Sequence, residues 1–247
     1  MPHAKVEIAT PDGVADALFF TPDGQGPWPA VIMYTDIFGS RPVFEGMAAR
    51  LAGLGFAVIL PNCYYRIGPA PLPAPEGAFG EPAFMQALYA RKASLGRDVI
   101  LRDIGAVLEW LGDRSEVASG GVGIVGYCMS GAFALWAAAA FPDKIVAAAS
   151  FHGGGLATEE PDSPHLGAPQ IKARVLVGHA TADRMMPPEM IETFDSALTA
   201  AGVRLEAEVY PGAHGFAVEG GPAYDKPSCD RHWDRMTALF TETLQAG

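Results

Sequence analysis

The chain has 247 residues, of which 49% are hydrophobic and 18% charged, and its net charge at pH 7 is −11. A negative protein repels the phosphates of nucleic acids, so the charge argues against a nucleic-acid partner. The apolar run at residues 132–141 is too short to cross a bilayer, so no membrane partner is expected.

Two further features favour a reducing cytoplasm. The N-terminal residues 1–7 contain no apolar segment of the kind found in secretory signals. Three cysteines, Cys63, Cys128 and Cys229, cannot all pair in disulfides. We expect one domain over residues 1–247, present as a monomer or a weak homodimer.

The chain is predicted to open with an antiparallel β-hairpin. Residues 5–9 alternate in polarity, Pro11-Asp12-Gly13 is typical of a turn, and residues 14–20 continue as a second strand.

Apolar runs then alternate with segments of helical spacing. The runs suit strands that are covered on both faces, and they lie at residues 30–34, 56–60, 122–125, 146–150, 175–177 and 205–209. Helical spacing is clearest at residues 44–54, 100–111 and 233–244. The alternation predicts an α/β fold with a mostly parallel central sheet flanked by helices. The Pro- and Gly-rich residues 61–82 are predicted to form a long surface excursion near the functional site.

The segment Gly-Tyr-Cys-Met-Ser-Gly at residues 126–131 lies between a predicted strand and an Ala-rich helix. This layout is typical of a nucleophile elbow, in which the central side chain sits on a strained turn. Small residues flank the turn because a Cβ there would clash with the chain as it doubles back. The central residue is Cys128, which predicts a thiolate nucleophile. The backbone N–H of Met129 and one after the strand ending at Tyr34 are expected to form an oxyanion hole.

An acid and a histidine follow in the chain order known for enzymes with such an elbow. Asp183 comes after the strand at 175–177, and His214 lies between glycines after the strand at 205–209. His214 is expected to take the thiol proton of Cys128 and later return a proton to the leaving group, while Asp183 orients the imidazole. Asp162 and Asp195 compete for the acid role, but neither directly follows a strand.

Together these segments resemble the dienelactone hydrolase family, thiol-dependent members of the α/β-hydrolase fold. Thr-Asp-Ile-Phe-Gly at residues 35–39 is similar to the family's glutamate-Ile-Phe-Gly signature, with Asp36 in place of the glutamate. The segment at residues 61–66 also resembles the family's. The resemblance implies that Asp36 interacts with the resting cysteine and takes part in its activation, and that the N–H of Ile37 joins that of Met129 in the oxyanion hole.

The resemblance further implies hydrolysis of a small-molecule ester or lactone through a thioester acyl-enzyme, with no cofactor or metal. Family members that act on dienelactone hold its carboxylate with arginines. Val218 stands where one of them is expected, and Arg91 and Arg97 both remain open for the other. The residues expected to bind substrate are Tyr34, Phe38, Tyr64 and Arg91.

Two other functions remain open. The cysteine could serve an acyl transferase or a thioesterase, which product analysis with and without an added nucleophile would separate. The chain could also be a non-catalytic small-molecule-binding protein on a hydrolase fold. That function would predict an unreactive Cys128.

Overall fold

The computed structural model describes residues 3–245. Its strands are β1 (His3–Thr10), β2 (Gly13–Phe20), β3 (Ala30–Tyr34), β4 (Ala57–Pro61), β5 (Val122–Tyr127), β6 (Ile145–Phe151), β7 (Arg174–Ala182) and β8 (Arg204–Ala213). Its α-helices are α1 (Pro42–Ala52), α2 (Pro82–Ala93), α3 (Arg97–Gly112), α4 (Gly131–Ala140), α5 (Pro188–Ala200) and α6 (Lys226–Leu244). Short 3₁₀ helices cover Cys128–Ser130 and Pro164–Gln170.

All eight strands form one sheet in the order β1-β2-β4-β3-β5-β6-β7-β8. The N-terminal hairpin β1-β2 is antiparallel and joins the sheet antiparallel to β4. Every other neighbouring pair, from β4 through to β8, is parallel. The predicted α/β fold, with its mostly parallel sheet and N-terminal hairpin, is confirmed.

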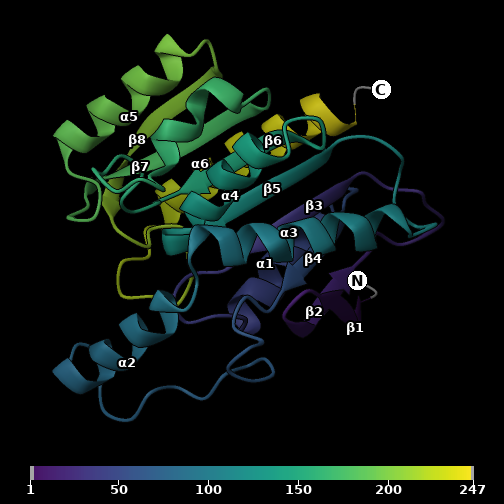
Figure 1. The fold of residues 1–247 in the computed structure, drawn as a ribbon, viewed down its shortest axis with the longest axis horizontal. Helices are drawn as coiled ribbons and strands as arrows, with labels where there is room; N and C mark the ends of the chain where they lie inside the picture. The colour runs from purple at the N-terminus through teal and green to yellow at the C-terminus, as the bar shows by residue number, and fades with distance from the viewer. Residues whose placement is uncertain (1–2, 246–247) are drawn as a thin grey trace.

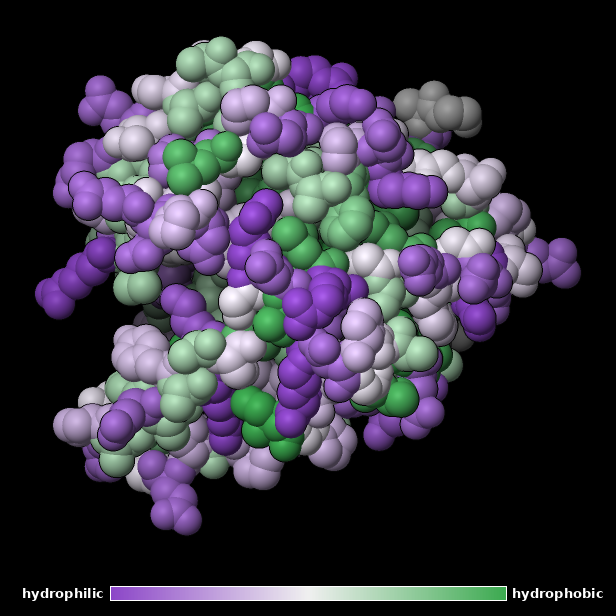
Figure 2. Space-filling view, viewed as in Figure 1, coloured by the Kyte–Doolittle hydropathy of each residue, from purple (hydrophilic) through white to green (hydrophobic). Residues whose placement is uncertain are grey.

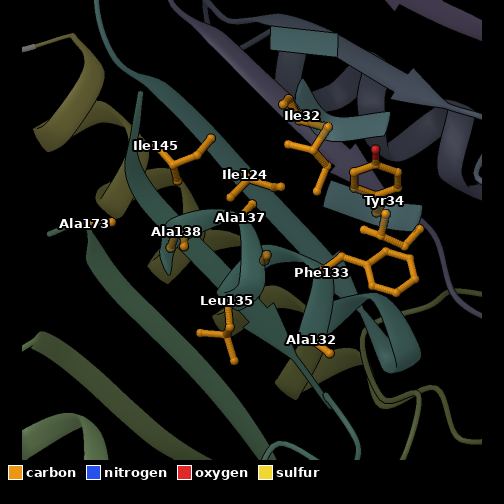
Figure 3. Close-up of a cluster of buried hydrophobic side chains, with 14 of the residues drawn as sticks. Ile32, Tyr34, Ile124, Ala132, Phe133, Leu135, Ala137, Ala138, Ile145 and Ala173 are labelled. Carbon is orange, nitrogen blue, oxygen red and sulfur yellow. The ribbon is translucent and has the colours of Figure 1, made fainter. Parts of the chain in front are cut away.

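Helices cover both faces of this sheet (Figure 1). Helices α1 and α6 pack on one face, and α3, α4 and α5 pack on the other. Strand β3 shows the resulting alternation, because Val31 and Met33 face the first layer while Ile32 and Tyr34 face the second. Figure 3 shows part of the second layer, where Ile32, Ile124 and Phe133 meet between β3, β5 and α4. Burial on both faces explains why these strands are continuous apolar runs.

The last two strands are longer than their apolar runs predicted. Pairing between β7 and β8 extends from Arg174 with Arg204 to Ala182 with Ala213. Strand β8 lies at the edge of the sheet, where the partly buried Glu206 and Glu208 alternate with the exposed Ala207 and Val209, so an apolar run marks only part of it. Helix α2 has only Phe84 and Leu88 buried, which is too sparse for a clear helical period in the sequence. No helix of residues 3–245 is both long enough and apolar enough to span a bilayer.

Ion pairs and hydrogen bonds fix the first part of the 61–82 excursion to the body of the protein. Arg66 forms two hydrogen bonds to Asp103 of α3, at 2.7 and 2.8 Å, and a third to Asp12. Asp16 of β2 accepts hydrogen bonds from the Asn62 side chain and from the backbone N–H of Ala70. The excursion is therefore an attached wall beside the carboxyl ends of β3 and β5.

Cys128 occupies a strained turn between β5 and α4. Its φ is +58°, a conformation that costs about 1 kcal/mol or more for a residue with a Cβ. The chain returns so tightly that a Cβ at Gly126 would lie 1.9 Å from the carbonyl oxygen of Ser130. A Cβ at Gly131 would lie 2.3 Å from the Ser150 hydroxyl. Gly126 and Gly131 are therefore required, because no residue with a Cβ fits at either position without a clash.

Replacement of Gly126 by alanine should destabilise the protein by about 3 kcal/mol, because the backbone atoms of Ser130 cannot move aside as a flexible side chain would. The free energy of unfolding in urea measures this change. Gly46→Ala is the matched control, since Gly46 lies within α1 and an added Cβ would meet nothing within 4 Å. That substitution should stabilise the protein by about 0.5–1 kcal/mol. Equal effects of the two variants would contradict the steric account of the elbow.

Candidate active site

Three side chains from the carboxyl ends of β5, β7 and β8 form a connected chain of hydrogen bonds. Nε2 of His214 lies 2.9 Å from Sγ of Cys128, and Nδ1 of His214 lies 2.7 Å from Oδ2 of Asp183. The other carboxylate oxygen of Asp183 accepts a hydrogen bond from the backbone N–H of Met185 at 2.8 Å. The strand-end positions expected from the sequence therefore meet in space with the distances that a thiol–imidazole–carboxylate set needs.

The environment of His214 favours its protonated form. Burial of the ring opposes the charge and lowers its pKa, but the hydrogen bonds to Asp183 and Cys128 outweigh burial. The net effect raises the pKa of His214 from 6.5 to about 10. The ring therefore keeps its positive charge through neutral pH, and an imidazolium beside Sγ favours the thiolate form of a cysteine.

The other two cysteines lie in different surroundings. Burial raises the pKa of the Cys63 thiol to about 12, and burial also raises the pKa of Cys229. Both side chains are buried, whereas Cys128 is partly exposed. Cys128 is thus the thiol that the structure presents to a solute.

The loop after β3 brings a second set of candidate groups to Cys128. The carbonyl of Ile37 accepts a hydrogen bond from the Tyr64 hydroxyl at 3.0 Å, and the same hydroxyl lies 3.5 Å from Sδ of Met129. Tyr64 therefore contacts both residues whose N–H groups are expected to hold an oxyanion. Within residues 3–245, no acceptor is found for the backbone N–H of Ile37. The N–H of Met129 lies in the first turn of a helix, where no intrahelical acceptor exists.

Asp36 pairs with Arg41 and shows no hydrogen bond to the resting thiol. The two guanidinium nitrogens of Arg41 reach the two carboxylate oxygens of Asp36 at 2.5 and 2.7 Å. Oδ1 of Asp36 also accepts from the backbone N–H of Phe38 at 3.0 Å. Arg41 lies only five residues along the same loop, and aspartate is one methylene shorter than the family's glutamate. The expected contact between Asp36 and Cys128 is therefore replaced by an ion pair within the loop.

A cavity of about 230 Å³ opens above Cys128 and His214, with Phe38 among the residues that line it. The surface is indented where helix α2 faces the rest of the molecule, at the left of Figure 2.

The other residues expected to bind substrate lie elsewhere. Tyr34 is a core residue whose ring packs on Phe133, as Figure 3 shows, and its buried hydroxyl has no hydrogen-bond partner among residues 3–245. Tyr64 stands behind the loop after β3, and Arg91 lies outside this cavity with a hydrogen bond to the carbonyl of Pro73.

His152 is a cavity residue that sequence reasoning did not single out. It directly follows β6, at the same edge of the sheet as Cys128, with φ at +41°. Its ring packs edge to face with His214, the centroids 5.4 Å apart, and neither ring nitrogen has a hydrogen-bond partner in the described residues. Burial, followed by the nearby His214 and His232, holds the pKa of His152 well below 6.5. A neutral ring at this place does not repel the charged His214. Its position after a parallel strand is the signal that could have found it.

Helix α2, the excursion before it and the loop after β8 supply most of the remaining cavity wall. Met85, Leu88, Tyr89 and Lys92 come from α2, and Phe79 comes from the excursion. Arg41 and Met185 also line the cavity. These residues are far apart in the sequence, so no local pattern marks them as neighbours.

The competing acids have other partners. Asp195 lies 3.3 Å from Nε2 of His179, and the backbone carbonyl of Asp162 accepts from the Trp136 indole. Asp183 is the acid that meets His214. In the part of the chain that the structure describes, no three His, Cys, Asp or Glu side chains gather as a metal-binding group.

The profile of the dienelactone hydrolase family matches residues 15–244, so the chain belongs to this family. A putative carboxymethylenebutenolidase of Escherichia coli O157:H7 is 30% identical over 225 residues, which cover 88% of this chain and 78% of that protein. A carboxymethylenebutenolidase of Rhodococcus opacus is 27% identical and covers 88% of this chain and 82% of its own length. The crystal structure of a putative dienelactone hydrolase from Klebsiella pneumoniae is 26% identical, covers 98% of both chains and has a TM-score of 0.85. The family and these relatives indicate a hydrolase.

Iodoacetamide should alkylate Cys128 alone in the native protein, because Cys63 and Cys229 are buried and their pKa values are raised. At neutral pH the rate should fall at least about threefold in His214→Ala, because the variant loses the ring whose Nε2 lies 2.9 Å from the sulfur and whose positive charge favours a thiolate. Peptide mass spectrometry identifies the site and gives the rates. Equal rates for the two proteins would contradict the charged state assigned to His214.

Proposed function

We propose that this hydrolase cleaves carboxylic esters or lactones through a covalent thioester on Cys128. The observation that carries the proposal is the position of His214, whose two ring nitrogens lie 2.9 Å from the Cys128 sulfur and 2.7 Å from the Asp183 carboxylate. A set of nucleophile, base and orienting acid at hydrogen-bond distances is the arrangement that covalent acyl transfer needs. Family membership supports the same reaction class.

In the proposed first half-reaction, the Cys128 thiolate adds to the substrate carbonyl carbon and the carbonyl oxygen becomes an oxyanion. The N–H groups of Ile37 and Met129 hold this oxyanion. The intermediate then collapses, the bond to the alcohol oxygen breaks, and His214 gives that oxygen its proton. The alcohol leaves and the acyl group remains on sulfur.

In the second half-reaction, His214 is neutral and takes a proton from water, which attacks the thioester carbonyl. Collapse of this second oxyanion breaks the carbon–sulfur bond and releases the carboxylic acid. Asp183 keeps Nδ1 of His214 as a donor throughout, so Nε2 faces the reacting groups. In this proposal Asp36 does not contact the thiol. It accepts hydrogen bonds from Arg41 and from the N–H of Phe38, which hold the loop after β3 in place, and this loop positions Ile37.

Replacement of Cys128 by alanine should lower kcat/KM for ester hydrolysis by at least about a thousandfold, because the nucleophile is lost. The measurement is hydrolysis of p-nitrophenyl acetate, a neutral lactone and an anionic dienelactone by the parent and the variant. Preference within the panel reports whether a substrate carboxylate is recognised.

Cys229→Ala is the matched control, since it makes the same change at a buried thiol of α6, outside the cavity, and should leave turnover unchanged. Equal rates for the parent and Cys128→Ala would contradict the proposal and favour a binding protein. Product analysis with added alcohols or thiols separates hydrolysis from acyl transfer.

Tyr64→Phe should lower kcat about tenfold with little change in KM, because it removes the hydroxyl that fixes the carbonyl of Ile37 while leaving the cavity wall intact. Steady-state kinetics with p-nitrophenyl acetate separate the two constants. Tyr34→Phe removes a hydroxyl that has no hydrogen-bond partner in the described part of the chain, so both constants should stay as in the parent. A rise in KM alone for Tyr64→Phe would contradict the positioning role.

A further inference from the structure

A second, larger cavity adjoins the one above Cys128. Its volume is about 790 Å³, against about 230 Å³ for the inner cavity. Cavities that hold small ligands usually measure about 300–1,000 Å³, so the inner cavity alone is small for a substrate and the outer one is of ordinary size. The residues that line both are Phe38, Arg41, Phe79, Leu88, Gly221 and Pro222. The two cavities are therefore adjacent and share one wall.

The outer cavity has an apolar wall built mainly by the excursion and by α2. Pro71, Leu72, Ala74 and Pro75 line it from the excursion, and Phe84 lines it from α2. Phe79 stands between the two cavities, with its ring 5.9 Å from that of Phe38 and 6.0 Å from that of Phe84. Phe79 is 61% exposed, so its ring adds to the apolar surface that Phe38 and Phe84 offer to a ligand.

The wall is attached to the protein on both sides. The start of the excursion is held by the ion pair of Arg66 with Asp103 and by Asp16. Its middle is held by a hydrogen bond from Arg91 of α2 to the carbonyl of Pro73, at 2.8 Å. The outer cavity is thus a formed groove, and a ligand need not order a loop to enter it.

Two of the three charged side chains at this groove are engaged within the chain, and the third, Glu219, is negative and would repel an anionic group. The Arg41 guanidinium is bound to both oxygens of Asp36, and Arg91 donates to the Pro73 carbonyl. Capture of a substrate carboxylate by Arg41 would break an ion pair in which Asp36 is nearly buried and would leave that carboxylate unpaired. The groove therefore suits a neutral group.

We propose that the substrates of this enzyme are esters or lactones that carry an extended, neutral, apolar arm, and that the groove between the excursion 61–82 and α2 binds this arm. The inference rests on the proposed function, since it takes the substrate carbonyl to lie at Cys128. The arm passes Phe79 and contacts Leu72, Ala74 and Phe84, while the small inner cavity holds the reacting carbonyl.

The test uses alkyl trifluoromethyl ketones, with arms from butyl to octyl, as inhibitors of p-nitrophenyl acetate hydrolysis. The Cys128 thiolate adds reversibly to the carbonyl carbon of such a ketone. Because the ketone carries only one long arm, this arm can enter the groove whichever way the carbonyl is oriented. Burial of each added methylene should lower the inhibition constant about fourfold. A ketone of the same length whose arm ends in a carboxylate should bind at least about tenfold more weakly.

Ala74→Trp places an indole where the arm is proposed to lie and should abolish the dependence of inhibition on arm length. Ala78→Trp is the matched control, because Ala78 lies on the same excursion and lines neither cavity, and it should keep that dependence. An inhibition constant that is independent of arm length in the parent, or a length dependence that survives Ala74→Trp, would overturn the proposal. Tighter binding of the carboxylate-ended ketone would overturn it too, and would assign the groove to an anionic arm near Arg91.

The same assay separates this proposal from the one on which it rests. Acetate hydrolysis that is unchanged in Cys128→Ala contradicts the proposed function, whatever the ketones do. If hydrolysis depends on Cys128 but the inhibition constant does not change with the arm length of the ketone, the proposed function stands and only the proposal about the groove is contradicted.

Discussion

The turn that carries Cys128 is the constraint on which the rest of the site depends. Strand β5 ends at Tyr127, α4 begins at Gly131, and the chain reverses between them with Cys128 at a φ of +58°. Such a conformation persists only when its surroundings determine it. Here the Ser130 hydroxyl accepts from the backbone N–H of Tyr127 at 2.8 Å and donates to the Tyr127 carbonyl at 3.0 Å, which closes the turn from inside. The Ser130 side chain therefore fixes the turn with two hydrogen bonds to the backbone of Tyr127.

Once the sulfur is fixed, the parallel sheet brings the other groups to it. The carboxyl ends of β3, β5, β6, β7 and β8 lie along one edge, and each is followed by a residue of the site. The low dielectric of this partly buried edge strengthens the hydrogen bonds of His214, which is why they outweigh burial in setting its pKa. The neighbouring His152 stays neutral for the opposite reason, since it is buried without a partner. Two imidazoles in contact thus hold different charges because only one of them has a carboxylate.

The sequence was sufficient for the parts of the fold and site that depend on local pattern or chain order. The elbow is a local pattern of small residues around Cys128, and Asp183 and His214 each follow a strand, so all three could be predicted without coordinates. Helix α2 could not, because its two buried residues leave hardly any apolar period. Nor could the groove, whose walls join residues from the excursion, α2 and the loop after β8. Tyr34 and Tyr64 look alike in sequence, as tyrosines near strand ends, yet one packs in the core and the other braces a loop.

The ion pair between Asp36 and Arg41 has a consequence for how the thiol is activated. In the family pattern, an acidic side chain contacts the resting cysteine, so the thiol changes its partner when substrate arrives. In this structure the acid is held by Arg41, and the sulfur already lies 2.9 Å from His214. Arg41 is itself fixed by the rings of Phe38 and Phe44, with its guanidinium carbon 5.2 and 4.9 Å from their centroids. In the resting structure Cys128 is therefore already in contact with His214, and Asp36 serves the loop that carries Ile37 instead of the thiol.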